Sequence, residues 1–154
     1  MRKLFAIACA LACLPADASP LIDEAELWMH DHIVLTMTPP GNWGVGVDPQ
    51  LNRAIHMARE NCRIMSGTKS SVDGCGAYLS NIRAGWSLGI RCGDRHTIIV
   101  ADRDLAQAEQ RAVAREREIR EKYDPQAPAC ARVVTVTPGG FIIREAQGPA
   151  VAAD

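Results

Sequence analysis

The chain has 154 residues, and its 17 lysine and arginine residues against 18 aspartate and glutamate residues give a formal charge of −1. This length fits a single domain. The near-neutral balance of charges gives no electrostatic basis for binding nucleic acid or an anionic membrane surface. We therefore expect a partner of neither kind.

The N-terminus predicts a bacterial export signal. Arg2 and Lys3 precede an apolar run over residues 4–14, and A-D-A at 16–18 supplies the small residues of a cleavage site. We expect residues 1–18 to be a signal peptide cleaved near Ala18, which leaves a periplasmic or secreted chain. The apolar run is too short to span a bilayer as a helix, and no later run is longer, so no transmembrane segment is expected.

The cysteines fall into two groups. Two lie in the predicted signal, where A-L-A-C at 10–13 loosely resembles a lipobox, so lipidation at Cys13 is the alternative to simple cleavage. The other four predict two disulfides in an exported chain. Three connectivities are possible; we favour Cys62 with Cys75, across two neighbouring strands, and Cys92 with Cys130, across the second helical segment. A zinc site is the alternative, but the sequence has no C-x-x-C spacing.

The first elements of the mature chain predict an arm and then a domain. Residues 19–40 are expected to form an N-terminal arm, a short helix or extended segment that runs into a strand at I-V-L-T-M. T-P-P-G-N at 38–42 predicts a turn, because the two prolines lack N–H donors and disfavour helix before them. The domain itself is expected over residues 41–145, and residues 146–154 as a flexible tail.

A strand and a helix are predicted next. Residues 43–47 (W-G-V-G-V) alternate large residues with glycine, as a strand does where another backbone packs against its glycine face. We expect Asp48 to cap a helix with Pro49 at its first position. The apolar stripe of this helix recurs at helical spacing: Leu51, Ala54, Ile55, Ala58 and Cys62. Residues 62–65 are expected to return as a strand and 75–79 to run back beside them, with a polar tip at 67–74.

The second half repeats part of the first. G-N-W-G-V-G-V at 41–47 reappears as A-G-W-S-L-G-I at 84–90, so we expect two pseudo-duplicated strand-helix-strand units. A strand at 97–100 should follow a turn at Gly93-Asp94, and a helix should run from Asp102 or Asp104 to about Tyr123. Residues 132–137 predict a strand and 141–143 an edge strand. The order predicts an α+β fold, with two helices on one mostly antiparallel sheet stapled by disulfides.

These motifs resemble a known group of proteins. W-G-V-G-V, a helix, C-R-I-M, G-C-G-A at 74–77 and G-W-S-L-G, followed by an Ala/Glu-rich helix, are similar to the small exported bacterial proteins of domain-of-unknown-function family 4189. The resemblance covers roughly residues 43–137. It implies a fold and an exported location and carries no established reaction, so no catalytic residue follows from it.

The residues that could carry chemistry form no complete site. His30 and His32 could hold a metal with His56 or His96, but the sequence identifies no third ligand at a suitable spacing. G-N-W-G-V-G at 41–46 lacks the lysine of a phosphate loop, so no cofactor is expected. Cys75 beside His96 could serve a cell-wall hydrolase or amidase, which is the alternative enzymatic hypothesis.

The remaining hypothesis is binding. A disulfide-stapled exported domain without a coherent active site is typical of inhibitors and immunity proteins that neutralise a cell-envelope toxin or hydrolase. Polar loops on such a scaffold commonly carry recognition, and the candidate contact residues are Lys69, Arg91, Asp94, Arg95 and His96. An envelope structural or stress protein without enzymatic activity is the third hypothesis. The sequence leaves the oligomeric state open.

Overall fold

The computed structural model describes residues 31–67 and 74–144. The predicted signal peptide, Lys69 and the predicted tail lie outside the described residues. The elements in chain order are β1 (His32–Met37), β2 (Trp43–Asp48), α2 (Leu51–Ser66), β3 (Tyr78–Arg83), β4 (Trp86–Cys92), β5 (His96–Asp102), α3 (Leu105–Glu118), the π-helix η1 (Ile119–Tyr123), β6 (Cys130–Val136) and β7 (Ile142–Arg144).

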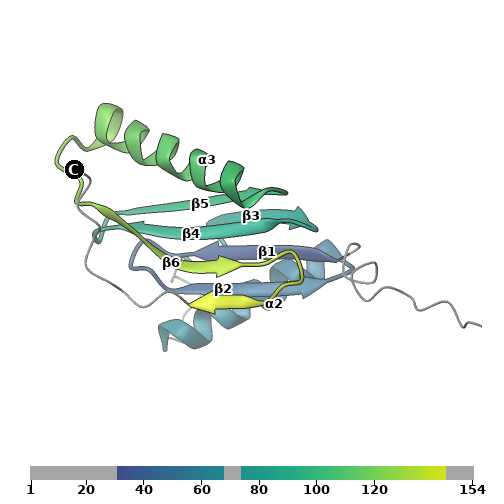
Figure 1. Ribbon diagram of the computed structural model, residues 1–154. Coiled ribbons are helices and arrows are strands. Elements are labelled where there is room, and N and C mark those ends of the chain that lie inside the picture. The colour runs from purple at the N-terminus through teal and green to yellow at the C-terminus, as the bar shows by residue number, and fades with distance from the viewer. Residues whose placement is uncertain (1–30, 68–73, 145–154) are drawn as a thin grey trace, which may run out of the picture.

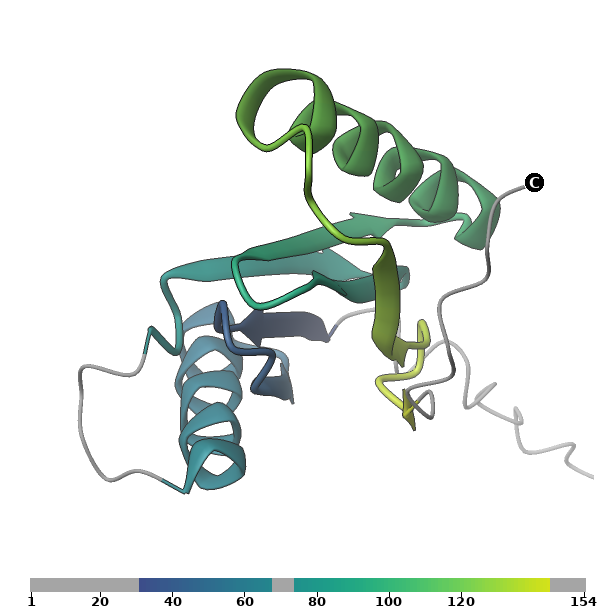
Figure 2. The same ribbon diagram turned by 90° about the vertical axis from the view of Figure 1, so that its left-hand side faces the viewer.

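The strands form two antiparallel sheets in a four-layer arrangement. The first sheet has the order β2-β1-β3 and the second β5-β4-β6-β7. Both views place α2 outside the first sheet and α3 outside the second, with the sheets facing each other between the helices (Figures 1 and 2). The predicted α+β class with two helices is therefore confirmed. The expected single sheet is replaced by two, because β1, which we assigned to the arm, is the central strand of a sheet in the first half of the chain.

The alternation of side chains along β1 explains the layers. Ile33, Leu35 and Met37 point into a core shared with Val134 and Val136 of β6, which holds the two sheets together. Val34 points the other way, onto Ala54 and Ala58 of α2. Since successive side chains of a strand face opposite sides, one buried strand serves both packing layers. A third cluster, which includes Leu88, Ile98 and Ala108, joins the second sheet to α3.

Two glycines of β2 allow α2 to lie directly on the sheet, as the sequence predicted. A Cβ at Gly44 would lie 2.2 Å from the carbonyl oxygen of Ala58, and one at Gly46 would lie 2.0 Å from that of Ala54. No side chain fits in this space. The predicted apolar stripe is confirmed as well, because Ala54, Ala58 and Cys62 are fully buried beneath the helix.

The predicted bounds of α2 were wrong at both ends. The helix begins after Gln50, and the Asp48 carboxylate accepts the Gln50 N–H two residues ahead of it (2.7 Å). Residues 62–65 continue the helix instead of forming a strand, and the helix ends at Gly67, whose φ of 68° is left-handed. Cys62 therefore bonds to Cys75 from a helix, not from a neighbouring strand, although the predicted pairing itself is confirmed.

The predictions for the second half are closer to the structure. The strand at 97–100 lies within β5, and the last two strands occur as β6 and β7. Asp104 caps α3, its carboxylate accepting the Gln107 N–H (3.0 Å), and the helical path continues through η1 to Tyr123. The favoured pairing of Cys92 with Cys130 is confirmed. It joins the paired strand ends of β4 and β6.

The fold is duplicated, but not with the boundaries that the Trp-Gly pattern suggested. Each half is a hairpin, a helix and a strand: β1-β2-α2-β3 and then β4-β5-α3-β6. In both halves the last strand pairs with the first strand of the hairpin. Trp43 opens the second strand of its hairpin, whereas Trp86 opens the first strand of the other. The two tryptophans therefore occupy unequal positions in the repeat.

Candidate binding surface

The turn between β4 and β5 is fixed at its base. Residues 93–95 connect the paired ends Cys92 and His96, and the fully buried Cys92 is bonded to Cys130 of β6. Gly93 takes a φ of 61°, which a residue without Cβ adopts easily. Pro128 packs against this glycine, since a Cβ there would lie 2.4 Å from the Pro128 ring. The turn is thus held by a covalent bond and by a close contact with the segment before β6.

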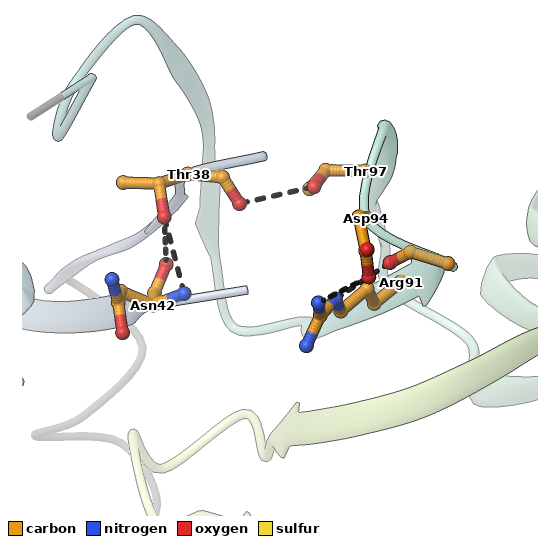
Figure 3. A network of polar contacts seen from close by, with 6 residues as sticks. Thr38, Asn42, Arg91, Asp94 and Thr97 are labelled. Atoms are coloured by element: carbon orange, nitrogen blue, oxygen red, sulfur yellow. Dashed lines mark hydrogen bonds and ion pairs between the residues drawn. The ribbon is translucent and has the colours of Figure 1, made fainter. Parts of the chain in front are cut away.

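Arg91 stabilises the turn through hydrogen bonds to its backbone and to Asp94. Its Nε donates to the carbonyl of Gly93 at 2.6 Å, and its Nη2 donates to Asp94 Oδ1 at 3.0 Å. The same side chain lies over Gly41, where a Cβ would come within 2.9 Å of Arg91 Cδ. Figure 3 shows Arg91 beside Asp94, and the Thr38 and Asn42 side chains nearby. Arg91 therefore orders the turn and also contacts the turn between β1 and β2.

The β1–β2 turn is itself tightly hydrogen-bonded. Thr38 N donates to the Asn42 carbonyl at 2.8 Å, and Asn42 N donates to Thr38 Oγ1 at 3.1 Å. Thr97 at the start of β5 then donates from Oγ1 to the Thr38 carbonyl at 3.1 Å, so the two turns are joined (Figure 3). This T-P-P-G-N segment was predicted as a turn, and the structure adds that it supports the candidate contact residues.

His96 joins a third segment to the turn. Its Nε2 lies 3.1 Å from Asp124 Oδ2, and both side chains are about three-quarters buried, with 25% and 23% exposed. Asp124 follows η1 directly, and its other carboxylate oxygen accepts the Gln126 N–H at 3.2 Å. A hollow of ≈400 Å³ lies here, lined by Cys92, Gly93, Asp94, Arg95, Asp124, Gln126 and Pro128.

The outer face of the turn carries two exposed charged side chains. The Asp94 side chain is 92% exposed. Arg95 is also exposed, and among residues 31–67 and 74–144 no side chain or carbonyl pairs with it. Of the five predicted contact residues, the structure thus brings Arg91, Asp94, Arg95 and His96 to one rigid turn, while Lys69 lies outside the described residues. We refer to residues 93–96 with their supports as the β4–β5 turn surface.

The predicted metal alternatives gain no support from the described histidines. His32 lies with Nε2 2.6 Å from Arg83 Nη2, and its Nδ1 lies 3.0 Å from Asn81 Oδ1. Since an arginine can only donate, Nε2 accepts and Nδ1 carries the proton, so neither nitrogen has a lone pair left for a metal. His56 is exposed on α2. Within the described part of the chain, no group of three potential ligands could hold a metal ion, and His30 lies outside that part.

The nucleophile of the hydrolase alternative is in a disulfide. Cys75 Sγ is bonded to Cys62 Sγ, so in this oxidised form no thiol exists at that position. A cysteine hydrolase needs a thiolate beside its base. The residue that does lie beside His96 is Asp124, which the sequence indicated only as the end of a helix. Its sequence context gave no sign of that contact, because the two residues are 28 positions apart.

Comparisons with protein-family models, with curated proteins and with solved structures returned no match to this chain. The resemblance to family 4189 therefore remains a prediction. None of the helices in the described residues is long and apolar enough to cross a membrane. The two disulfides fit an extracellular or periplasmic protein, since such bonds persist in oxidising compartments.

Proposed function

We propose that this chain is an exported, non-catalytic binding protein that uses the β4–β5 turn surface to bind a protein partner. We propose further that it is an inhibitor or immunity protein and that its partner is a cell-envelope toxin or hydrolase. The observation that carries the proposal is the construction of this turn: it presents exposed Asp94 and Arg95, while Arg91 and the Cys92–Cys130 bond hold its backbone.

The rigidity of the β4–β5 turn favours a role in recognition over that of an ordinary surface loop. Ordering flexible side chains and loops on binding reduces affinity, so a turn that is already ordered retains more of its contact energy. The Thr97 bond to Thr38 and the Arg91 contacts fix this turn before any partner arrives. Charged residues of both signs at its tip suit a charged cleft, where they favour a correctly oriented partner and discourage wrong ones.

Arginine at such a position is a frequent source of binding energy. Interfaces concentrate their energy in a few residues, with arginine among the enriched types. Arg95 has an exposed guanidinium with no intramolecular partner in the described residues, so it gives up no existing bond when it meets a carboxylate. Asp94 differs, because Arg91 already neutralises part of its charge. We therefore assign the leading role to Arg95.

The first test is capture of the partner. The tagged mature chain beginning at Ser19, kept oxidised, is used as bait against envelope and secreted fractions, and co-eluting proteins are identified by mass spectrometry. One stoichiometric partner that is retained by the native chain and lost by Arg95→Glu supports the proposal. A clean column, or a partner retained equally by the variant, removes it. Arg117→Glu is the matched control, because Arg117 is an exposed arginine on α3.

A count of free thiols separates this proposal from the hydrolase alternative. The binding protein needs all four mature cysteines in disulfides, so titration of the unfolded, unreduced chain should find no thiol. The hydrolase needs Cys75 free. Reactive thiol at Cys75 in protein isolated without reductant would favour the enzyme.

A further inference from the structure

A groove runs beside the candidate turn, along the outer edge of β5. Its wider end, of ≈730 Å³, is lined by residues 77–79 at the start of β3, by residues 97–99 of β5, and by Arg115, Glu118, Ile119 and Tyr123. Its narrower continuation, of ≈510 Å³, follows residues 99–101 of β5 beneath Arg111, Ala114, Arg115 and Glu118. The two parts share Ile99, Arg115 and Glu118, so together they follow most of the strand.

Both strands that border the groove are sheet edges. Within the described residues, β5 pairs with β4 alone, and β3 pairs with β1 and makes one isolated bridge from Tyr78 to Cys75. The two edge strands lie next to each other, and α3 covers β5 from the other side (Figure 1). An edge strand leaves alternate backbone N–H and C=O groups unpaired, which makes it a template for a further strand. The β5 edge has no proline and no glycine between His96 and Asp102 to prevent such pairing.

The walls of the groove carry exposed apolar side chains. Tyr78 is 58% exposed and Leu79 44% exposed on the β3 side, and Tyr123 is 72% exposed on the η1 side. A strand added to β5 points its side chains alternately to its two faces. One set would meet Tyr78 and Leu79, and the other would meet Ile119 and Tyr123. The groove thus matches the two faces of an extended chain better than it matches a helix.

The charges along the groove favour an acidic occupant. Arg111 and Arg115 line it, with 64% and 66% of their side chains exposed, while Glu118 is the only acidic residue among the lining residues named above. Arg111 is paired with Asp102 and also donates to the Ala101 carbonyl of β5, and Arg115 is paired with Glu118. A guanidinium has five N–H donors, so these bonds do not use all of them. Acidic residues of an occupant can use these donors.

We infer that this groove binds an extended segment of the protein partner as an added strand on the β5 edge, with apolar residues at alternate positions and an acidic residue opposite Arg111 or Arg115. The inference rests on the proposed binding function and names the kind of segment that the partner contributes. The groove begins next to the β4–β5 turn surface in the chain, because Thr97 lines the groove and His96 belongs to the turn. A partner could therefore contact the turn and pair with the strand in one interface. Strand addition of this kind takes its affinity from backbone bonds and its specificity from alternate side chains.

The experiment uses a displayed library of random dodecapeptides selected on the oxidised mature chain, so that no natural partner is needed. Selected peptides should alternate apolar residues, be enriched in Asp or Glu, and contain no proline at their centre. Their affinity, measured by fluorescence anisotropy, should fall at least about tenfold in Leu79→Lys and in Tyr123→Lys. Val113→Lys is the control, because Val113 is an exposed apolar residue (57%) on α3 that does not line the groove.

Several results would overturn the inference. One is a selection without enrichment, and another is a set of peptides whose binding is unchanged in Leu79→Lys and Tyr123→Lys. Conversion of a dimer to a monomer by Leu79→Lys, measured by light scattering, would identify a second copy as the occupant and overturn it as well. The two proposals fail separately. If Arg95→Glu loses the captured partner and Leu79→Lys keeps it, the groove proposal is wrong and the turn proposal stands. If selected peptides bind the groove but Arg95→Glu still binds the partner, the turn proposal is wrong and the groove proposal stands.

Discussion

Replacing Gly46 by alanine tests the close packing of α2 on the first sheet. The added Cβ would lie 2.0 Å from the Ala54 carbonyl oxygen and 2.7 Å from the Ala58 nitrogen, both of which belong to the helix backbone. Overpacking costs about 1–3 kcal/mol where side chains can move aside. A helix backbone cannot rotate away, and the Cys62–Cys75 bond restrains the far end of α2, so we expect a loss of about 3 kcal/mol.

Gly139→Ala is the matched control for this prediction. A Cβ at Gly139 would meet only the Phe141 ring, at 3.1 Å, and that side chain is 71% exposed and free to move. Both substitutions remove the same backbone freedom from the unfolded chain, so their difference reports the native contact. Urea unfolding of the oxidised proteins gives each free energy from its midpoint and slope. A difference between the two variants of less than about 0.5 kcal/mol would refute the packing argument.

Three further predictions concern disulfides, pH and the link between the turns. Converting Cys92 and Cys130 to alanine should lower stability by about 4 kcal/mol, and Cys62 with Cys75 by about 3 kcal/mol, because they close loops of 38 and 13 residues; urea unfolding of each double variant measures this. Hydrogen bonds from Arg115 and Lys122 hold the pKa of Glu118 below its ordinary value, so their stabilisation is present above the pKa of the unfolded chain and is lost as pH falls through the lowered folded pKa. Lys122→Ala should raise that pKa in an NMR titration of the carboxyl, and an unchanged midpoint would contradict the assignment. Thr97→Val removes the bond to the Thr38 carbonyl and should cost about 1 kcal/mol, together with weaker partner binding; intact affinity would show that the bond does not order the turn.

Local patterns predicted much of this fold. The glycine alternation of β2 indicated a close backbone neighbour, and α2 lies there. The β-branched run of β6 and the start of α3 at Asp102 or Asp104 were also evident from the sequence, because each depends on residues close together in the chain; the structure shows that Asp104 is the cap. The favoured cysteine pairs are confirmed, although the reason given for Cys62–Cys75 was wrong, since Cys62 lies in a helix.

The division into two sheets could not be predicted from local patterns. C-R-I-M at 62–65 is compatible with a helix or a strand, and its buried Cys62 continues the stripe of α2. The role of β1 depends on pairing with β3, whose residues lie some 40 or more positions further along the chain. Long-range pairing of this kind is decided by the whole fold and not by the propensity of a short segment.

The same contrast between local patterns and long-range contacts holds for the candidate site. Arg91, Asp94, Arg95 and His96 were predicted together because they lie in one turn. Thr38, Gly41 and Asp124 were missed as supports, because each reaches the turn from a distant segment. The groove beside β5 was missed entirely, since it requires β3 and η1 to meet at one sheet edge.

The measurement that tests the central claim most directly is the dissociation constant of the captured partner for the native chain, Arg95→Glu and Arg117→Glu, obtained by calorimetry at one ionic strength. The turn proposal predicts that Arg95→Glu weakens binding at least about tenfold, or about 1.4 kcal/mol, while Arg117→Glu changes it little. Equal affinities for all three proteins, with each variant folded and fully oxidised, would contradict the claim that the β4–β5 turn surface binds the partner.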